Sequence, residues 1–127
     1  MTVAAVIQMN ATSNVEANWR QASALIRRAA GLGAVFVATP ENTSFLGPHE
    51  EKVELAETLD GLTCERFSKL ADELGIHLLL GSFNEASEEP GRCHNTSVLF
   101  GPEGSRLAVY RKIQLVDVDV SPEVSFT

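Results

Sequence analysis

Three short apolar stretches, residues 3–9, 34–38 and 76–83, are separated by longer stretches in which apolar and polar residues mix. The short stretches are rich in valine, isoleucine and leucine and lack a regular polar alternation, which is typical of strands buried on both faces. They therefore predict three internal strands of one sheet.

Apolar residues recur at intervals of three and four in the two segments that separate these strands, the pattern of an amphipathic helix. The first series comprises Val15, Trp19, Ala22, Ile26 and Ala29, and the second comprises Phe67, Leu70, Ala71 and Leu74. Ser13 or Asn14 can cap the first helix, and Gly75 can end the second. Because a helix connects them, the first two strands are expected to be parallel.

The remaining segments are more polar, or change the pattern from helix to strand. Residues 42–61 are acidic and predict a solvated short helix and loop, and residues 84–91 are rich in turn formers and charge and predict an exposed loop. Residues 94–100 and 106–112 flank a Gly-Pro-Glu-Gly turn and predict a hairpin. The fold class is therefore α/β, with a mixed sheet and two helices on one face.

Charge and composition exclude several classes of function. The formal net charge of −7 argues against nucleic acid and anionic membrane surfaces as partners, since both need a basic face. No apolar run approaches the roughly 20 residues needed to span a bilayer, and the first residues lack the features of a signal peptide, so we expect a cytoplasmic protein. The three histidines are scattered and give no spacing typical of a metal site.

Two residues of opposite charge are candidates for chemistry. Glu41 follows a proline at the end of the second predicted strand, and Lys112 stands at the end of the hairpin. Side chains at strand ends can converge on one pocket while the sheet holds them in place. A carboxylate and an ammonium group placed together can take up a proton and stabilise an oxyanion.

Six short motifs surround these residues. They are Gln8-Met9, Ala29-Ala30-x-x-Gly33-Ala34, Thr39-Pro40-Glu41-Asn42, Leu80-Gly81-Ser82, Asn95-Thr96-Ser97 and Tyr110-Arg111-Lys112-Ile113-x-Leu115-x-Asp117-x-Asp119. In this order and spacing the chain resembles the nitrilase (carbon-nitrogen hydrolase) superfamily, in its amidase-like branch related to Nit proteins and omega-amidase. The resemblance extends over essentially the whole chain.

The resemblance implies an αββα sandwich, of which residues 1–127 would be the N-terminal portion, truncated before the second half. It implies a Glu-Lys-Cys triad in which Glu41 is the general base and Lys112 stabilises the tetrahedral intermediate, while the cysteine nucleophile would lie downstream. It also implies a small-molecule amide substrate, no cofactor and a homo-oligomer. The 127 residues alone are therefore expected to be inactive.

The two cysteines of the chain do not match the family nucleophile. Cys64 would lie at the start of a helix that faces away from the strand ends, and Cys93 would lie in an exposed loop. We expect structural or incidental thiols at both positions. Glu123 is out of register with the second glutamate of many members and receives no role.

The chain departs from the family pattern at two positions. Gln114 stands where relatives commonly have histidine, and His94 stands where an aromatic residue often precedes Asn-Thr. Two other interpretations stay open: a non-catalytic remnant or assembly module of the same fold, and an acidic binding domain without hydrolase ancestry. The second of these requires Glu41 and Lys112 to lie far apart.

Overall fold

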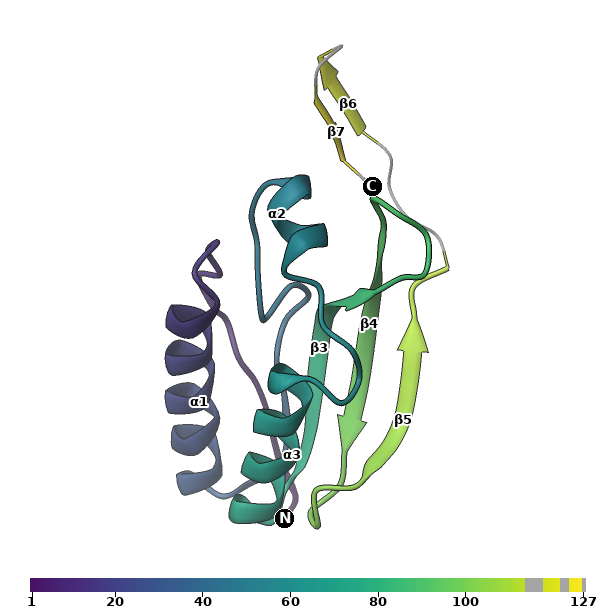
Figure 1. Cartoon of the computed structure of the whole chain (residues 1–127). Coiled ribbons are helices and arrows are strands. Elements are labelled where there is room, and N and C mark those ends of the chain that lie inside the picture. The colour runs from purple at the N-terminus through teal and green to yellow at the C-terminus, as the bar shows by residue number, and fades with distance from the viewer. Residues whose placement is uncertain (114–117, 122–123, 127) are drawn as a thin grey trace.

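The computed structural model describes residues 1–113, 118–121 and 124–126. Its elements run in the order β1 (Val3–Val6), α1 (Val15–Gly31), β2 (Ala34–Ala38), α2 (His49–Glu54), α3 (Leu62–Leu74), β3 (His77–Ala86), β4 (Cys93–Phe100), β5 (Arg106–Arg111), β6 (Val118–Ser121) and β7 (Val124–Phe126). The positions of the two long helices, α1 and α3, and of the predicted hairpin agree with the sequence analysis (Figure 1).

One five-stranded sheet carries the fold, with strands in the order β1-β2-β3-β4-β5. The first three strands are parallel, and β4 and β5 continue the sheet in antiparallel fashion. The predicted parallel pairing of the first two strands is thus confirmed, and the sheet is mixed. Strands β6 and β7 pair with each other in a separate two-stranded sheet.

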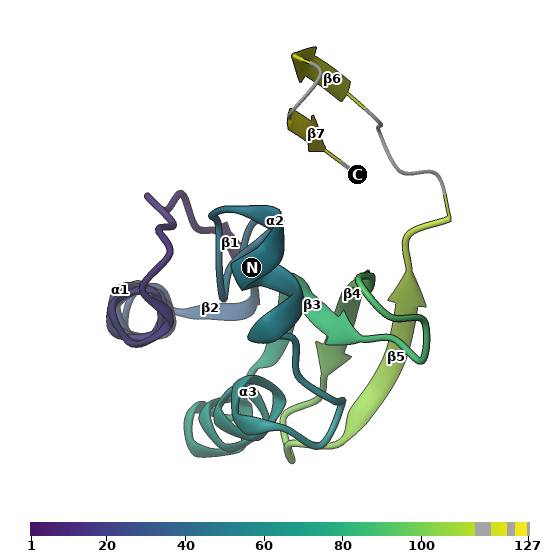
Figure 2. The same ribbon diagram turned by 45° about the horizontal axis from the view of Figure 1, so that its top comes forward.

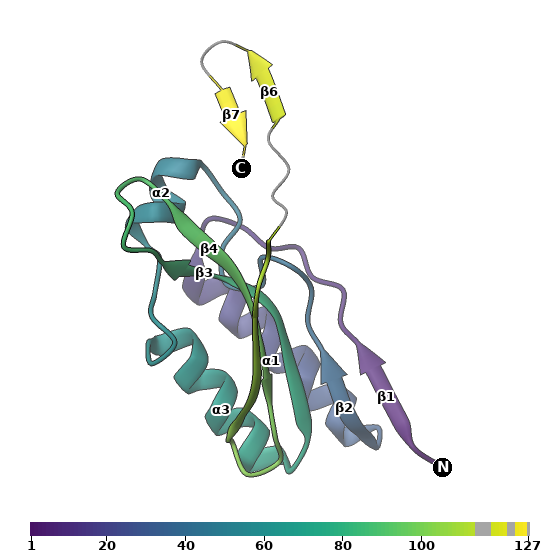
Figure 3. The same ribbon diagram turned by 90° about the vertical axis from the view of Figure 1, so that its right-hand side faces the viewer.

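The helices α1 and α3 lie on the same face of this sheet (Figures 2 and 3). Phe67 of α3 packs there with side chains that alternate along the strands, including Leu78, Leu80, Val98 and Phe100, and all five are at most 2 % exposed. Burial of one such side chain stabilises the fold by about 1.5–3 kcal/mol. This helix-covered face is the hydrophobic core.

The opposite face of the sheet is apolar as well. Strand alternation and register place Phe36, Leu79, Leu99 and Tyr110 on it. Within the described residues no helix covers this side of the sheet (Figure 3). Tyr110 is 57 % exposed as a result. We refer to this side as the open face.

Local signals set the helix ends. Asn14 caps α1 because its side-chain oxygen accepts a hydrogen bond from the amide of Ala17 at 3.0 Å. Gly75 ends α3 in the left-handed conformation, with φ of 64°. Both features agree with the caps expected from the sequence.

Two strand boundaries differ from the prediction. Strand β1 ends at Val6 instead of residue 9, and β3 extends to Ala86, so the prediction of an exposed loop over residues 84–91 is wrong for its first three residues. The backbone of Glu57 pairs with both flanking residues of Glu85, since its N–H donates to the carbonyl of Asn84 and its carbonyl accepts from Ala86. These two hydrogen bonds from Glu57 help to keep residues 84–86 extended, and the polar composition of the segment gives no sign of them.

Gln114 and Glu123 lie outside the described residues. The helices found in the described part of the chain are all too short or too polar to cross a lipid bilayer.

Candidate active site

Glu41 lies in a turn directly after β2, where the chain passes closely over β3. The backbone amide of Gly81 donates a hydrogen bond to the hydroxyl of Thr39 at 3.1 Å. A Cβ atom at Gly81 would lie 2.1 Å from the Thr39 carbonyl oxygen and 2.3 Å from that of Pro40. Only glycine permits this close approach, so Gly81 sets the height at which Glu41 stands above the sheet.

The turn is also held on its far side. Asn42 has a left-handed backbone, with φ of 58°, and its amide donates to the hydroxyl of Ser82 at 2.8 Å. Asparagine tolerates this conformation better than most residues because its short side chain bonds locally. The next residue, Thr43, donates its hydroxyl to that of Thr39 at 2.9 Å, which closes the turn.

The carboxylate of Glu41 contacts two side chains from the other end of the chain. Its Oε1 accepts a hydrogen bond from Nδ2 of Asn95 at 2.7 Å and lies 3.2 Å from Nζ of Lys112. The side chain of Glu41 is 54 % exposed and that of Lys112 is 37 % exposed. Glu41, Asn95 and Lys112 form the rim cluster, which remains open to solvent.

The hairpin brings Asn95 and Lys112 together. The amide of Lys112 donates to the carbonyl of Asn95 at 2.9 Å, which continues the β4–β5 ladder by one pair. Paired residues of neighbouring strands share a face, so both side chains point to the open face, where Glu41 lies. The sequence motifs included Asn95 but gave it no role; its place opposite Lys112 in the hairpin register is the signal that could have revealed it.

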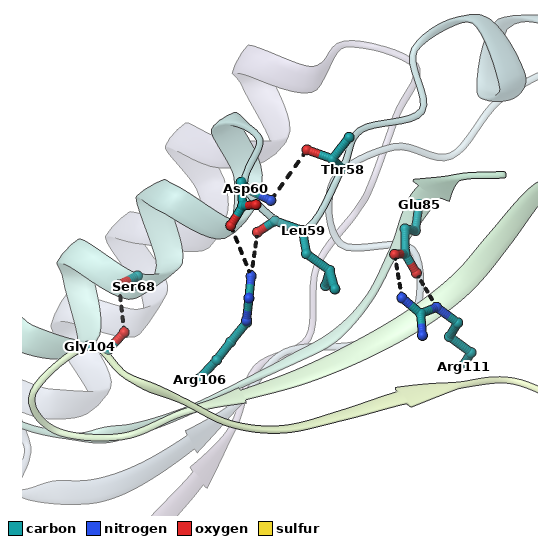
Figure 4. A network of polar contacts seen from close by, with 8 residues as sticks. All are labelled: Thr58, Leu59, Asp60, Ser68, Glu85, Gly104, Arg106 and Arg111. Carbon is teal, nitrogen blue, oxygen red and sulfur yellow. Dashed lines mark hydrogen bonds and ion pairs between the residues drawn. The ribbon is translucent and has the colours of Figure 1, made fainter. Parts of the chain in front are cut away.

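A second charged cluster occupies the helix-covered face of the same strands (Figure 4). Glu85, only 7 % exposed, accepts hydrogen bonds from Arg111 through both oxygens, from Nε at 2.6 Å and from Nη2 at 2.7 Å. The hydroxyl of Thr96 donates to Oε1 at 2.8 Å. The Arg111 guanidinium, aided by Thr96, holds the pKa of this carboxyl below its ordinary value despite burial. Glu85, Thr96 and Arg111 form the clamp.

The sequence analysis missed the clamp because it placed Glu85 in an exposed loop. A fork–fork contact between arginine and carboxylate needs the two planar groups to meet edge to edge, with the arginine supplied by another element of the fold. Nothing in the composition of residues 84–91 indicated such an element. The one available signal was Arg111 itself, beside Lys112 on a strand where alternation sends the two side chains to opposite faces.

Neither cysteine lies in the rim cluster. Cys64, on α3, is 3 % exposed, and burial raises the pKa of its thiol to about 12, so that the helix N-terminus does not activate it. Cys93 was expected in an exposed loop; it is instead the first residue of β4 and half-buried, and burial also raises the pKa of its thiol. Both are free thiols.

A cavity of about 280 Å³ lies at the start of β4. Its lining includes two basic side chains, Lys52 and Arg92, and two imidazoles, His49 and His94. Arg92 also lies 3.5 Å from Glu89, the carboxylate of this lining. Within the described residues, no three histidine, cysteine or acidic side chains are grouped to hold a metal ion.

Comparison with known proteins places the chain in a family. The model of the carbon-nitrogen hydrolase family matches residues 3–127. Human omega-amidase NIT2 is 40 % identical over 124 residues, which cover 96 % of this chain and 44 % of that protein. The deaminated glutathione amidase of a Synechocystis strain is 36 % identical over 119 residues, covering 93 % of this chain and 44 % of the relative. The chain thus spans less than half the length of these curated relatives.

Solved structures agree with the sequence matches. The NitFhit protein of C. elegans superposes with a TM-score of 0.82 at 28 % identity, over 94 % of this chain and 29 % of that protein. Yeast Nit3 superposes with a TM-score of 0.75 at 23 % identity, over 86 % of this chain and 44 % of that protein, and so supports the fold alone. With its mixed sheet, its helix-covered face and a family match over nearly every residue, the chain belongs to the carbon-nitrogen hydrolase family.

Proposed function

We propose that residues 1–127 form the N-terminal portion of an amide hydrolase domain that works by Glu-Lys-Cys chemistry, with Glu41 and Lys112 as two of its catalytic residues. The observation that carries the proposal is the contact of Glu41 Oε1 with both Lys112 Nζ and Asn95 Nδ2. The contact and the family membership together argue against an acidic binding domain without hydrolase ancestry, which required the two charges to lie apart.

The chemistry needs a thiol from a segment beyond these residues. As the thiol sulfur attacks the amide carbon, its proton passes to the carboxylate of Glu41, and Lys112 stabilises the oxyanion of the tetrahedral intermediate. Glu41 then returns the proton to the departing amine, which leaves a thioester. Water attacks the thioester with Glu41 again as the base, and the acid product and the free thiol are released. Such a sequence needs no cofactor.

Asn95 has a supporting role in this scheme. Its Nδ2 donates to the same carboxylate oxygen that faces Lys112, and so restricts rotation of the Glu41 side chain. A general base is effective only when held within hydrogen-bond reach of the proton that it removes. The amide of Asn95 therefore orients Glu41 without adding charge to the site.

The substrate that we propose is a small amide that carries a carboxylate. The cavity with Lys52 and Arg92 in its lining is also lined by Cys93, which alternation places on the same face of β4 as Asn95. Two residues along a strand span about 7 Å, a distance that a short dicarboxylic acid monoamide can bridge. Its amide would meet the rim cluster while its carboxylate meets the basic lining.

The test is release of ammonia from a short dicarboxylic acid monoamide. The 127-residue chain alone is expected to release none, whereas the longest polypeptide that its gene encodes is expected to be active. In that polypeptide, Glu41→Gln and Lys112→Met should each lower kcat/KM by about 100-fold or more. Glu65→Gln is the matched control, because Glu65 forms an exposed ion pair with Lys69 on α3, away from the rim cluster.

Three outcomes would contradict the proposal. Release of ammonia by the 127 residues alone, abolished by Glu41→Gln, would show that no further thiol is needed. Full activity of the longer polypeptide after Glu41→Gln would exclude this residue as the base. A defect in Glu65→Gln equal to that in Glu41→Gln would show that loss of any surface ion pair has the same effect.

The open face supports a second candidate, an assembly module without catalysis. Its apolar side chains, among them Phe36, Leu79 and Leu99, have no helix over them within the described residues. Exposed apolar patches of this kind drive association. This candidate predicts dimers or larger species of the 127-residue chain, and we propose the same self-association for the hydrolase. A monodisperse monomer by light scattering would contradict it.

A further inference from the structure

Glu85 is a buried charge that the proposed chemistry does not use. Moving a carboxylate out of water is costly unless its hydrogen bonds are replaced. Here they are replaced by Arg111 on both oxygens (Figure 4), and by the hydroxyl of Thr96 on one of them. An ion pair so fully satisfied fixes the position of both partners.

The clamp joins strands that are not neighbours. Glu85 lies on β3 and Arg111 is the last residue of β5, with β4 between them in the sheet. The Arg111 side chain therefore reaches across β4, past Thr96, which pairs with it in the ladder. The end of the edge strand β5 is in this way tied directly to an interior strand.

The residue after the clamp is Lys112, and its position depends on two attachments. One is the hydrogen bond from its own amide to the carbonyl of Asn95, and the other is the clamp on the preceding residue. The next residue, Ile113, is 84 % exposed and contributes little packing. Lysine has a long flexible side chain, so a displaced backbone would readily lose its contact with Glu41.

We propose that Glu85 and Arg111 are positioning residues, which hold the end of β5 so that the ammonium group of Lys112 meets the carboxylate of Glu41. The clamp works from the helix-covered face, while the contact that it maintains lies on the open face. The role assigned to Lys112 in catalysis rests on the proposed function, but the positioning itself does not.

The chain offers a convenient readout, because it contains only three lysines, Lys52, Lys69 and Lys112. An amine that contacts a carboxylate reacts more slowly with an acylating reagent than a free amine. Limited acetylation of the 127-residue chain with acetic anhydride, followed by mass spectrometry, gives the rate at Lys112 relative to Lys69. Lys69 has its own ion pair on α3 and serves as the internal reference.

Two variants break the clamp. Glu85→Gln removes the charge while keeping the shape, and the double variant Glu85→Gln/Arg111→Gln avoids leaving the arginine without its carboxylate partner if the single variant folds poorly. In either variant the relative rate of acetylation at Lys112 should rise about threefold. This factor corresponds to loss of the stabilisation that an exposed ion pair provides. Glu41→Gln should raise it by a similar factor, which calibrates the measurement.

Arg106→Gln is the matched control. Arg106 lies at the other end of β5 and also bridges to a neighbouring segment, through Asp60 at 3.3 Å and the carbonyl of Leu59 at 3.0 Å (Figure 4). This variant removes an arginine contact from the same strand and should leave the relative rate at Lys112 unchanged.

The outcomes separate positioning from stability and from catalysis. If both clamp variants unfold at lower urea concentration but leave the relative rate at Lys112 unchanged, the clamp stabilises the sheet and positions nothing. A rise in Arg106→Gln equal to that in the clamp variants also overturns the proposal. Since no turnover is measured, an inactive longer polypeptide would contradict the proposed function and leave this result intact.

Discussion

Two ion pairs hold the same end of β5 to the rest of the molecule, and they differ in access to water. Glu41 and Lys112 meet on the open face, where both side chains are more than one third exposed, whereas Glu85 meets Arg111 on the helix-covered face, where the carboxylate side chain is 9 % exposed and the arginine side chain is 48 % exposed. Exposed pairs contribute about 0–1 kcal/mol, while leaving a buried carboxylate without its hydrogen-bond partner costs about 1–3 kcal/mol. Stability and reactivity are therefore assigned to opposite faces of one strand.

The carboxylates of Glu41 and Glu85 are not interchangeable. A general base must exchange protons with substrate and water, and a solvent-exposed carboxylate with few hydrogen-bond partners, like that of Glu41, can do so. A carboxylate saturated by a guanidinium and a hydroxyl, like that of Glu85, holds its position but accepts protons poorly. Measurements on single variants can test this division between the two faces.

The largest difference is expected between the two thiols. Cys64 belongs to the helix-covered face, and with its pKa raised to about 12 it should react with a disulfide reagent at pH 8 about a thousandfold more slowly than an unperturbed cysteine. Cys93 should react first, although more slowly than a free thiol, because burial raises its pKa as well. Stopped-flow kinetics of the single variants Cys64→Ser and Cys93→Ser would check the order. Faster reaction at Cys64 than at Cys93 would show that solvent reaches the Cys64 thiol on the helix-covered face.

Removal of one clamp partner should cost most in stability. Arg111→Met leaves the buried carboxylate of Glu85 without its guanidinium and should lower the free energy of unfolding by about 1–3 kcal/mol, less than for a fully buried pair because the Arg111 side chain is 48 % exposed. Urea unfolding followed by circular dichroism measures this change. The double variant with Glu85→Gln should recover part of the loss. A cost below about 1 kcal/mol would place this pair with the exposed ones.

The clamp should also make stability depend on acid. Because the folded-state pKa of Glu85 lies below its unfolded value, the clamp contributes fully above the unfolded pKa, near the ordinary 4.5, and its contribution is lost as the pH falls through the folded pKa. Urea midpoints from pH 7 down to pH 3 should therefore fall less steeply in Glu85→Gln/Arg111→Gln than in the parent chain. Parallel curves for the two proteins would count against the lowered pKa.

The smallest effect on stability is expected at the rim. Glu41→Gln and Lys112→Met should each change the free energy of unfolding by less than about 1 kcal/mol, because both side chains are solvated. The same urea measurement checks this. A loss of unfolding free energy as large as that of Arg111→Met would mean that the rim cluster stabilises the fold, and it would contradict the proposed division between the two faces.

Much of the fold could be predicted from the sequence because its signals are local. The stripe through Trp19, Ala22 and Ile26 indicates α1, and Gly75 ends α3 where the sequence places a helix stop. The patterns of strands and helices indicate the α/β class, and the family resemblance of the whole chain, confirmed by the match over residues 3–127, adds the type of fold. Glu41 and Lys112 were candidates because each stands at the end of a predicted strand and within a family motif, and their roles stay predictions.

The parts that escaped prediction depend on contacts distant in sequence. Whether Glu85 lies in a loop or a strand is decided by its pairing with His94 of β4, by the backbone of residue 57 and by an arginine 26 positions away. Cys93 was assigned to a loop for the same reason, since β4, of which it is the first residue, begins within a polar segment. Periodicity reports which face of an element is apolar, but it does not report a polar partner supplied by another strand.

The bare backbone at Gly81 has a consequence for protein engineering. Since the Thr39 and Pro40 carbonyls occupy the space of a side chain there, any larger residue would act as a wedge beneath the turn that carries Glu41. Such a wedge would lift the carboxylate away from Asn95 and Lys112 without altering any charged group. A substitution at Gly81 can therefore change the distances within the rim cluster while its three residues stay the same.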